Sequence, residues 1–162
     1  MGVVVSIEID APKKVVWAVI TDIENAVNNI SGIKKIEIIK KPDLSLLGLK
    51  WIETREMFGK DATETMWVSK VENDSFYETS AYNSGCHYKT ILSVEELDGG
   101  KTLFKMDFSA IPDTLVAKLL SPLGFMFRGM IKKALMTDLE DIKKVAEAGY
   151  EIGAGSKTAK LN

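Results

Sequence analysis

The single cysteine and the single histidine of this chain are adjacent, at Cys86 and His87, in the stretch MWVSKVENDSFYETSAYNSGCHYKT at residues 66–90. A nucleophilic Cys–His pair requires its two side chains to meet, whereas neighbours in a strand point to opposite faces. The two residues therefore cannot form a dyad with each other, and the pattern leaves open which of them faces inward. One His and one Cys also cannot complete a tetrahedral zinc site without further ligands, so we expect no metal site.

Charged residues on neighbouring expected strands form a second group that could take part in chemistry. Trp51, Glu53 and Arg55 alternate along one expected strand, so they share a face of it. If that face is inward, the strand carries a buried charge pair on an apolar surface, because a lone buried charge is too costly. If it is outward, the pair is an ordinary exposed ion pair. Glu64 lies across the expected turn at residues 59–61 and is a candidate partner of Arg55.

The candidate catalytic residues are Glu53, Glu64 and His87, and the sequence gives none of them a definite role. A carboxylate beside an apolar cavity can have a raised pKa and act as a general acid or base. Simpler interpretations exist for each. Glu53 with Arg55 would set the register of a strand, and His87 would be a strand residue at a surface or at the mouth of a cavity.

Most of the chain between residues 33 and 112 is expected to form strands. β-branched and aromatic residues recur there with a period of two, and turn residues such as Asp98-Gly99-Gly100 separate the runs. A further strand opens the chain. The expected strands are 3–9, 33–40, 46–58, 62–71, 76–83, 86–97 and 102–111.

Helices are expected at the two ends of this strand-rich region. Asp10-Ala11-Pro12 has the form of a helix start, and two short helices should follow the first strand. A long amphipathic helix should run from Pro122 to about residue 148, with Gly149 at its C-terminal end. Residues 149–162 lack periodicity, and we expect a flexible tail there, beyond a single domain at residues 1–148.

This order of elements predicts an α+β fold with a seven-stranded antiparallel sheet, since consecutive strands joined by hairpins pair antiparallel. A sheet of that size must curl, and the long helix can lie on its concave side. A straight helix cannot touch a curved sheet everywhere, so a hollow is expected between them. That hollow would explain why polar and apolar residues mix on both alternation sets of residues 66–90.

Composition narrows the classes of partner. The 162 residues carry a net charge of −2, with both signs mixed along the chain, which argues against a dedicated nucleic-acid surface. No apolar segment reaches the roughly 18 residues that a membrane span requires. The lone cysteine excludes an internal disulfide and favours a reduced, cytoplasmic setting. The oligomeric state stays open between a monomer and a weak dimer, and no cofactor is expected.

Several motifs resemble the START-like superfamily, also named SRPBCC or Bet v 1-like, and are most similar to its polyketide cyclase/dehydrase-type members. The resemblance covers about residues 3–148. Its motifs are Asp10-Ala11-Pro12 followed by Val16-Trp17, Trp51-x-Glu53-x-Arg55-x-Met57-Phe58-Gly59, Ala62-x-Glu64-x-Met66-Trp67-Val68, and Leu119-Leu120-Ser121-Pro122-Leu123 leading to Arg128-Gly129. It implies a helix-grip fold with an apolar cavity under the C-terminal helix, and it does not imply one reaction.

The cavity that this resemblance implies would be lined by residues from the strands and from the apolar stripe of the long helix. Met and aromatic residues in such a stripe suit changeable pockets, although the same pattern also builds ordinary cores. The candidate ligand-binding residues are Trp51, Arg55, Met66, Tyr88, Phe104, Met106, Phe108, Leu119, Leu123, Phe127, Met130, Ile131 and Ala134. The leucine-bearing loop at residues 42–48 is expected to be either a lid over the cavity or part of an interface.

Three functional hypotheses follow. The favoured one is a binding module that holds a small hydrophobic or amphipathic molecule, lipid-like or polyketide-like, in the cavity. The second is an enzyme of cyclase, aromatase or dehydratase type that uses Glu53, Glu64, His87 or Tyr88 as acid or base. The third is a protein-interaction domain whose hollow is filled by its own side chains.

Overall fold

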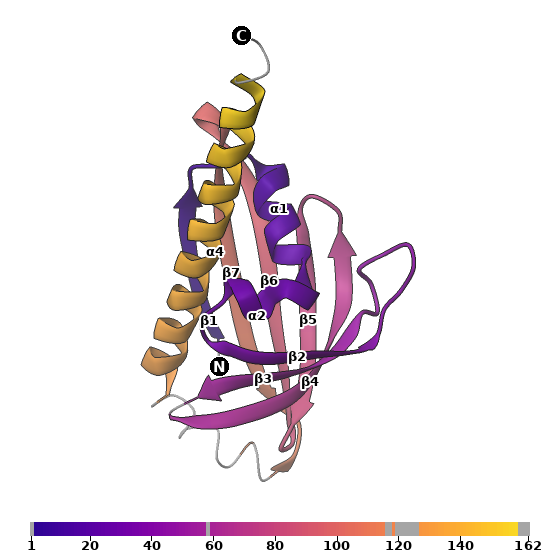
Figure 1. The fold of residues 1–162 in the computed structure, drawn as a ribbon. Coiled ribbons are helices and arrows are strands. Elements are labelled where there is room, and N and C mark those ends of the chain that lie inside the picture. The colour runs from indigo at the N-terminus through magenta and orange to yellow at the C-terminus, as the bar shows by residue number, and fades with distance from the viewer. Residues whose placement is uncertain (1, 58, 116–117, 119–126, 159–162) are drawn as a thin grey trace.

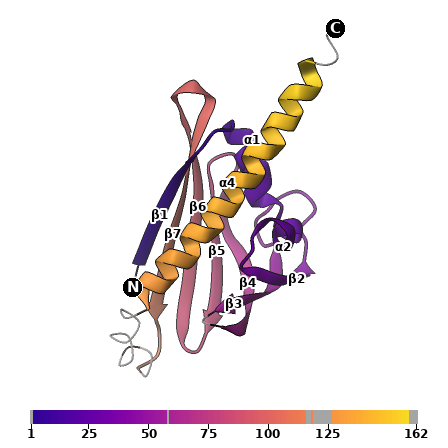
Figure 2. The same ribbon diagram turned by 60° about the vertical axis from the view of Figure 1, so that its left-hand side comes forward.

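The computed structural model describes residues 2–57, 59–115, 118 and 127–158. In this part of the chain a curved antiparallel sheet wraps around one long helix (Figures 1 and 2), which confirms the predicted α+β helix-grip architecture. The sheet has the order β1-β7-β6-β5-β4-β3-β2. Its strands are β1 Gly2–Ile9, β2 Ile33–Lys40, β3 Lys50–Met57, β4 Lys60–Glu72, β5 Phe76–Asn83, β6 Cys86–Leu97 and β7 Lys101–Pro112.

The helices lie on the concave face of the sheet. Two short ones, α1 (Lys13–Thr21) and α2 (Ala26–Asn29), follow β1 and are joined by the 3-10 turn η1 at Ile23–Asn25, while a second such turn, η2 at Asp98–Gly100, joins β6 to β7. The long helix α4 (Arg128–Thr158) packs against β1 and α1 and crosses the sheet diagonally (Figure 2). None of the helices in the described residues is both long and apolar enough to cross a membrane.

Two boundaries differ from the sequence expectation by more than two residues. Strand β3 begins at Lys50 instead of residue 46, because Gly48 adopts a positive φ of 83° and Leu49 N–H closes a turn on the Leu46 carbonyl at 3.1 Å. Helix α4 does not end at Gly149, which keeps a helical conformation, but continues to Thr158 (Figure 1). Glycine lowers helix propensity by only about 1 kcal/mol, so one glycine does not by itself stop a long helix. The expected start of this helix at Pro122 lies outside the described residues.

The core lies where α1 and α4 meet β1, β7 and β6. Its largest fully buried side chains include Phe104, Leu139, Ile9 and Val16. Hydrogen bonds tie the N-terminal segment to the sheet: Thr102 Oγ1 donates to the Ala11 carbonyl at 2.7 Å. This packing holds one half of α4 tightly on the sheet and leaves the other half to span the hollow described below.

The convex face of β5 also buries polar groups. Ser69 Oγ donates to Glu78 Oε1 at 2.8 Å and lies 2.8 Å from Ser80 Oγ, while Lys70 Nζ reaches Glu78 Oε2 at 3.3 Å. The polar strand residues in the stretch 66–90 therefore divide into two sets. One set forms hydrogen bonds and ion pairs among its own members on the convex face, and the other set faces the concave side.

Candidate ligand-binding cavity

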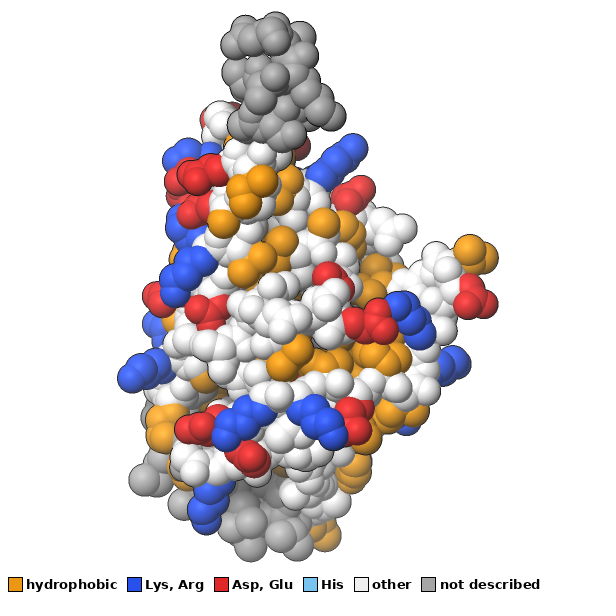
Figure 3. Space-filling model, in the orientation of Figure 1, with side chains coloured by type: hydrophobic (Ala, Val, Ile, Leu, Met, Phe, Trp, Pro, Cys, Tyr) orange, Lys and Arg blue, Asp and Glu red, His pale blue; other side chains and the backbone are white. Residues whose placement is uncertain are grey.

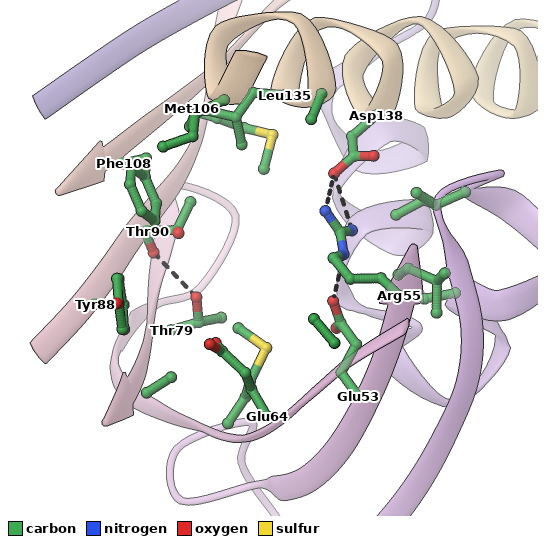
Figure 4. A pocket seen from close by; sticks show the side chains of 18 of the residues that line it. Glu53, Arg55, Glu64, Thr79, Tyr88, Thr90, Met106, Phe108, Leu135 and Asp138 are labelled. Carbon is green, nitrogen blue, oxygen red and sulfur yellow. Dashed lines mark hydrogen bonds and ion pairs between the residues drawn. The ribbon is translucent and has the colours of Figure 1, made fainter. Parts of the chain in front are cut away.

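A cavity of about 720 Å³ lies between the concave face of the sheet and the first half of α4. Its walls come from β3 to β7 on one side and from α1, η1, α2 and α4 on the other (Figure 4). Most of the lining side chains are apolar, and they include Met66, Met106, Ile131 and Leu135. The predicted hollow under the long helix is thus present, and it is large enough for a small-molecule ligand.

The turn between β5 and β6 decides which residues of these strands face the cavity. Ser84 and Gly85 both have positive φ, 51° and 76°, as a two-residue hairpin turn requires. A Cβ at position 85 would lie 2.5 Å from Thr114 Oγ1, so glycine is needed there for space as well. The turn pairs Asn83 with Cys86, and every second residue after Cys86 then points to the cavity.

This register answers the question that the sequence left open. Cys86 lines the cavity, whereas His87 lies on the convex face, where its ring packs against Tyr82 with centroids 4.6 Å apart. His87 Nε2 lies 3.7 Å from Asp113 Oδ2, and both side chains are exposed. Of the three candidate catalytic residues, His87 is therefore outside the cavity, and only Glu53 and Glu64 are in its wall.

The face of β3 that carries Trp51, Glu53 and Arg55 points inward, and these three side chains build the polar end of the cavity. Arg55 Nη1 and Nη2 donate to Asp138 Oδ2 at 3.1 and 3.0 Å. Arg55 Nε lies 2.9 Å from Glu53 Oε1, within ion-pair distance, but its N–H is not aligned for a hydrogen bond and finds no acceptor. Trp51 Nε1 donates to Glu53 Oε2 at 3.2 Å.

The predicted pair of Arg55 and Glu64 is wrong, because the second carboxylate comes from α4. Figure 4 shows Arg55 between Asp138 and Glu53, with Glu64 apart from them on β4. Glu64 instead accepts a long hydrogen bond from Asn83 Nδ2 at 3.4 Å. The Arg55 side chain reaches from β3 toward α4, where it meets Asp138 (Figure 4), and that meeting could not be read from strand alternation.

Burial and the neighbouring charges act in opposite directions on the pKa values of Asp138 and Arg55. The side chain of Asp138 is only 6% exposed, and its burial raises the pKa above the usual value of an aspartate, although Arg55 acts in the opposite direction. Burial alone would lower the pKa of Arg55, but Asp138 and Glu53 more than compensate and raise it. The arginine therefore stays charged, and the carboxyl group of Asp138 binds a proton more readily than an ordinary aspartate does.

The wall opposite this cluster is aromatic and carries hydroxyl groups. The rings of Tyr88 and Phe108 stack with centroids 6.2 Å apart and planes at 22°, and Thr79 Oγ1 donates to the Thr90 carbonyl at 3.4 Å (Figure 4). Burial, and then the nearby Cys86 and Glu64, raise the pKa of Tyr88. Its hydroxyl is therefore a neutral donor at physiological pH, beside a flat apolar surface.

The predicted ligand-binding residues divide into three groups. Those that line the cavity are Trp51, Arg55, Met66, Tyr88, Met106, Phe108, Phe127, Ile131 and Ala134. Phe104 and Met130 do not line it: Phe104 is fully buried beneath α1 and α4 in the core, and Met130 is 47% exposed on the outer side of α4. Leu119 and Leu123 lie outside the described residues.

Sequence reasoning missed Asp138 and the contribution of the N-terminal helices. Asp138 lies three residues after Leu135 and four before Ile142, in phase with the apolar stripe of the helix. A charged residue in that phase was a detectable signal of a buried polar site. The cavity is also lined by Val19 and Ile20 of α1, Ile23 of η1, Ala26 of α2, and Ile30, which directly follows α2.

The loop at residues 42–48 does not cover the cavity. It borders a separate hollow of about 370 Å³ together with Asp22 and Glu24, and it projects from the body of the molecule (Figures 1 and 3). Leu46 packs on the core while Leu44 is fully exposed. The lid interpretation is therefore not supported for the cavity under α4. Within the described residues, no group of three or more His, Cys, Asp or Glu side chains is placed to hold a metal ion.

Comparison with known proteins assigns most of the chain to one protein family. Residues 2–147 match the sequence profile of the family described as polyketide cyclase / dehydrase and lipid transport. No curated protein matches significantly.

Solved structures share the fold at low identity. The Zhui aromatase/cyclase of Streptomyces sp. R1128 is similar at 18% identity and a TM-score of 0.73, over 91% of this chain and 93% of that one. A START superfamily protein of Mycobacterium smegmatis is similar at 17% identity and a TM-score of 0.67, over 93% and 97%. A protein of Thermus thermophilus reaches a TM-score of 0.73 at 12% identity, over 92% and 99%.

Proposed function

The chain belongs to the family of polyketide cyclases, dehydrases and lipid-transport proteins, and on that premise we propose that it binds a small hydrophobic or amphipathic molecule between the sheet and α4. The observation that carries the proposal is the cavity of about 720 Å³ with apolar walls and one polar end. Ligand sites typically have volumes of roughly 300–1,000 Å³ and a few polar groups that orient the ligand. An interaction domain with a filled hollow would lack such a space.

The direct test uses a neutral fluorescent reporter of apolar sites, N-phenyl-1-naphthylamine, titrated with the full chain. We expect saturable binding, and we expect Ala134→Trp to weaken it by on the order of tenfold or more, because Ala134 lines the cavity and an indole there removes ligand volume. The matched control is Ala148→Trp, at an exposed position of the same helix, which should bind like the unaltered protein.

Two results would contradict the proposal. One is the absence of saturable reporter binding to the unaltered protein. The other is equal binding by the two tryptophan variants when circular dichroism shows both to be folded. Native followed by denaturing mass spectrometry of the purified protein adds an independent readout, since a copurifying apolar molecule would identify the natural ligand.

An enzymatic role of cyclase or dehydratase type is the second candidate, and Arg55 with Asp138 is the observation that favours it. Abstraction of a proton next to a carbonyl needs a carboxylate base and a donor for the oxygen that gains charge. Glu64 or ionised Asp138 would take the proton, and the Arg55 guanidinium would donate to the oxygen. His87 has no part in this proposal, because it lies on the convex face.

This candidate predicts catalysed exchange on a simple probe. In D₂O, the protein should speed the exchange of the central protons of a hydrophobic 1,3-diketone for deuterium. The measurement is the rate at which the proton NMR signal of these protons disappears. Glu64→Gln or Asp138→Asn, whichever removes the base, should slow that exchange while reporter binding persists, since the amides keep the shape but cannot accept the proton. Exchange at the rate of buffer alone would exclude the enzymatic candidate for this probe and leave the binding function standing.

A further inference from the structure

Two carboxylates face each other directly on the inner side of the sheet. The register of β3 and β4 pairs Glu53 with Glu64, and both side chains line the cavity (Figure 4). Like charges at directly opposed positions of neighbouring strands destabilise a sheet. A neighbouring cation or hydrogen-bond donor is therefore expected to offset this repulsion at each carboxylate.

The two carboxylates differ in the partners that offset their negative charge. Glu53 lies within 2.9 Å of Arg55 Nε and accepts from Trp51 Nε1. Glu64 accepts only from the neutral amide of Asn83, at 3.4 Å, and no cationic partner of Glu64 is found in the described part of the chain. The Glu64 carboxylate points into the cavity (Figure 4), so a ligand is placed to meet it.

The ionisable lining of the cavity has a negative excess. Glu53, Glu64 and Asp138 provide three carboxylates against the single guanidinium of Arg55, and Lys60 offsets Asp61 in the remaining lining, so the formal charge of the described lining is −2. Protonation of Asp138 leaves it at −1. Arg55 is already shared by Asp138 and Glu53, so an anionic ligand group would be a third carboxylate around one cation.

We propose that this cavity selects amphipathic molecules whose polar group donates hydrogen bonds and carries no negative charge, such as a hydroxyl or an amine, and disfavours carboxylate amphiphiles such as free fatty acids. Glu64 is the specificity-determining residue, because its acceptor oxygens face the cavity without a cation. An anionic group held next to a carboxylate that has no cationic partner loses hydration and gains repulsion. A hydroxyl or ammonium group can instead donate a hydrogen bond to the Glu64 carboxylate. The inference rests on the proposed binding function.

The experiment compares three probes with one chain and different polar ends: dodecanol, dodecylamine and dodecanoic acid. Each displaces the neutral reporter N-phenyl-1-naphthylamine from the full chain at neutral pH, below the concentration at which it forms micelles. We expect the alcohol and the amine to displace the reporter at concentrations on the order of tenfold lower than the acid. An acid that competes as well as the alcohol overturns the inference.

A pair of matched variants assigns the effect to Glu64. Glu64→Gln keeps the size of the side chain and removes its charge, so the preference for the alcohol over the acid should shrink several-fold. Glu95→Gln removes the same charge from an exposed position on β6 and should leave the preference unchanged. An unchanged preference in Glu64→Gln, or an equal loss in Glu95→Gln, overturns the inference. Failure of the reporter itself to bind would instead contradict the proposed binding function.

Discussion

Replacement of Arg55 with Met is expected to lower the free energy of unfolding by about 3–5 kcal/mol at neutral pH, because it leaves the buried Asp138 and the partly buried Glu53 without their cation. Methionine preserves most of the apolar stem of the side chain, so the loss reports the charge and its hydrogen bonds. The measurement is urea unfolding followed by circular dichroism, with the midpoint and the slope fitted together.

The same chain provides a matched control at its surface. Lys34 also bridges two carboxylates, at 3.1 Å from Glu56 and 2.6 Å from Asp61, but all three side chains are well exposed. Exposed ion pairs contribute about 0–1 kcal/mol, so Lys34→Met should change the unfolding free energy little. A double variant, Arg55→Met with Asp138→Leu, should recover part of the loss, since apolar replacement of a buried pair is often neutral.

The Arg55 variant also has an expected pH dependence. Without Arg55, the pKa of Asp138 in the folded protein rises further above its unfolded value. The unfolded chain then releases this proton first as the pH increases, so stability falls as the pH rises above the unfolded pKa of about 3.9. The deficit of the variant should be smaller near pH 4 than at pH 7. Equal deficits at the two pH values, or a loss no larger than that of Lys34→Met, would show that the cluster contributes no buried charge pair.

The second large effect separates the core from the cavity. Phe104→Ala should lower the free energy of unfolding by about 3–5 kcal/mol, because Phe104 is fully buried and its removal leaves an empty space in packed surroundings. Phe108 is four residues along the same strand and lines the cavity. Its ring has packing partners on fewer sides, so Phe108→Ala should cost clearly less stability.

Ligand binding should change in the opposite order. Phe108→Ala removes half of the stacked pair that Phe108 forms with Tyr88, so the affinity for the neutral reporter should fall by several-fold. Phe104→Ala, measured under conditions where it is still folded, should bind the reporter nearly as well as the unaltered protein. Equal stability losses from the two substitutions would mean that Phe108 is packed as core and that the cavity wall is misassigned there.

The order of elements was determined by local sequence signals. Alternating β-branched runs, the turn residues between them and the amphipathic stripe from Phe127 to Val145 were sufficient to predict seven antiparallel strands with a long helix behind them. These signals act between near neighbours along the chain. For the same reason, alternation showed that Cys86 and His87 must point apart, and that Trp51, Glu53 and Arg55 must point together.

Alternation assigns residues to two faces of a strand but does not say which face is inside. The Ser84-Gly85 turn and its register set that choice for β6, and they bring Cys86 into the cavity and His87 to the outer surface. The partner of Arg55 required still more: Asp138 is 83 residues away along the chain, and only the position of α4 on the concave side of the sheet brings the two side chains together. Pairing between distant segments depends on how a sheet curves and where a helix crosses it. Local residue patterns determined the elements of this protein, and tertiary packing determined the chemistry of its cavity.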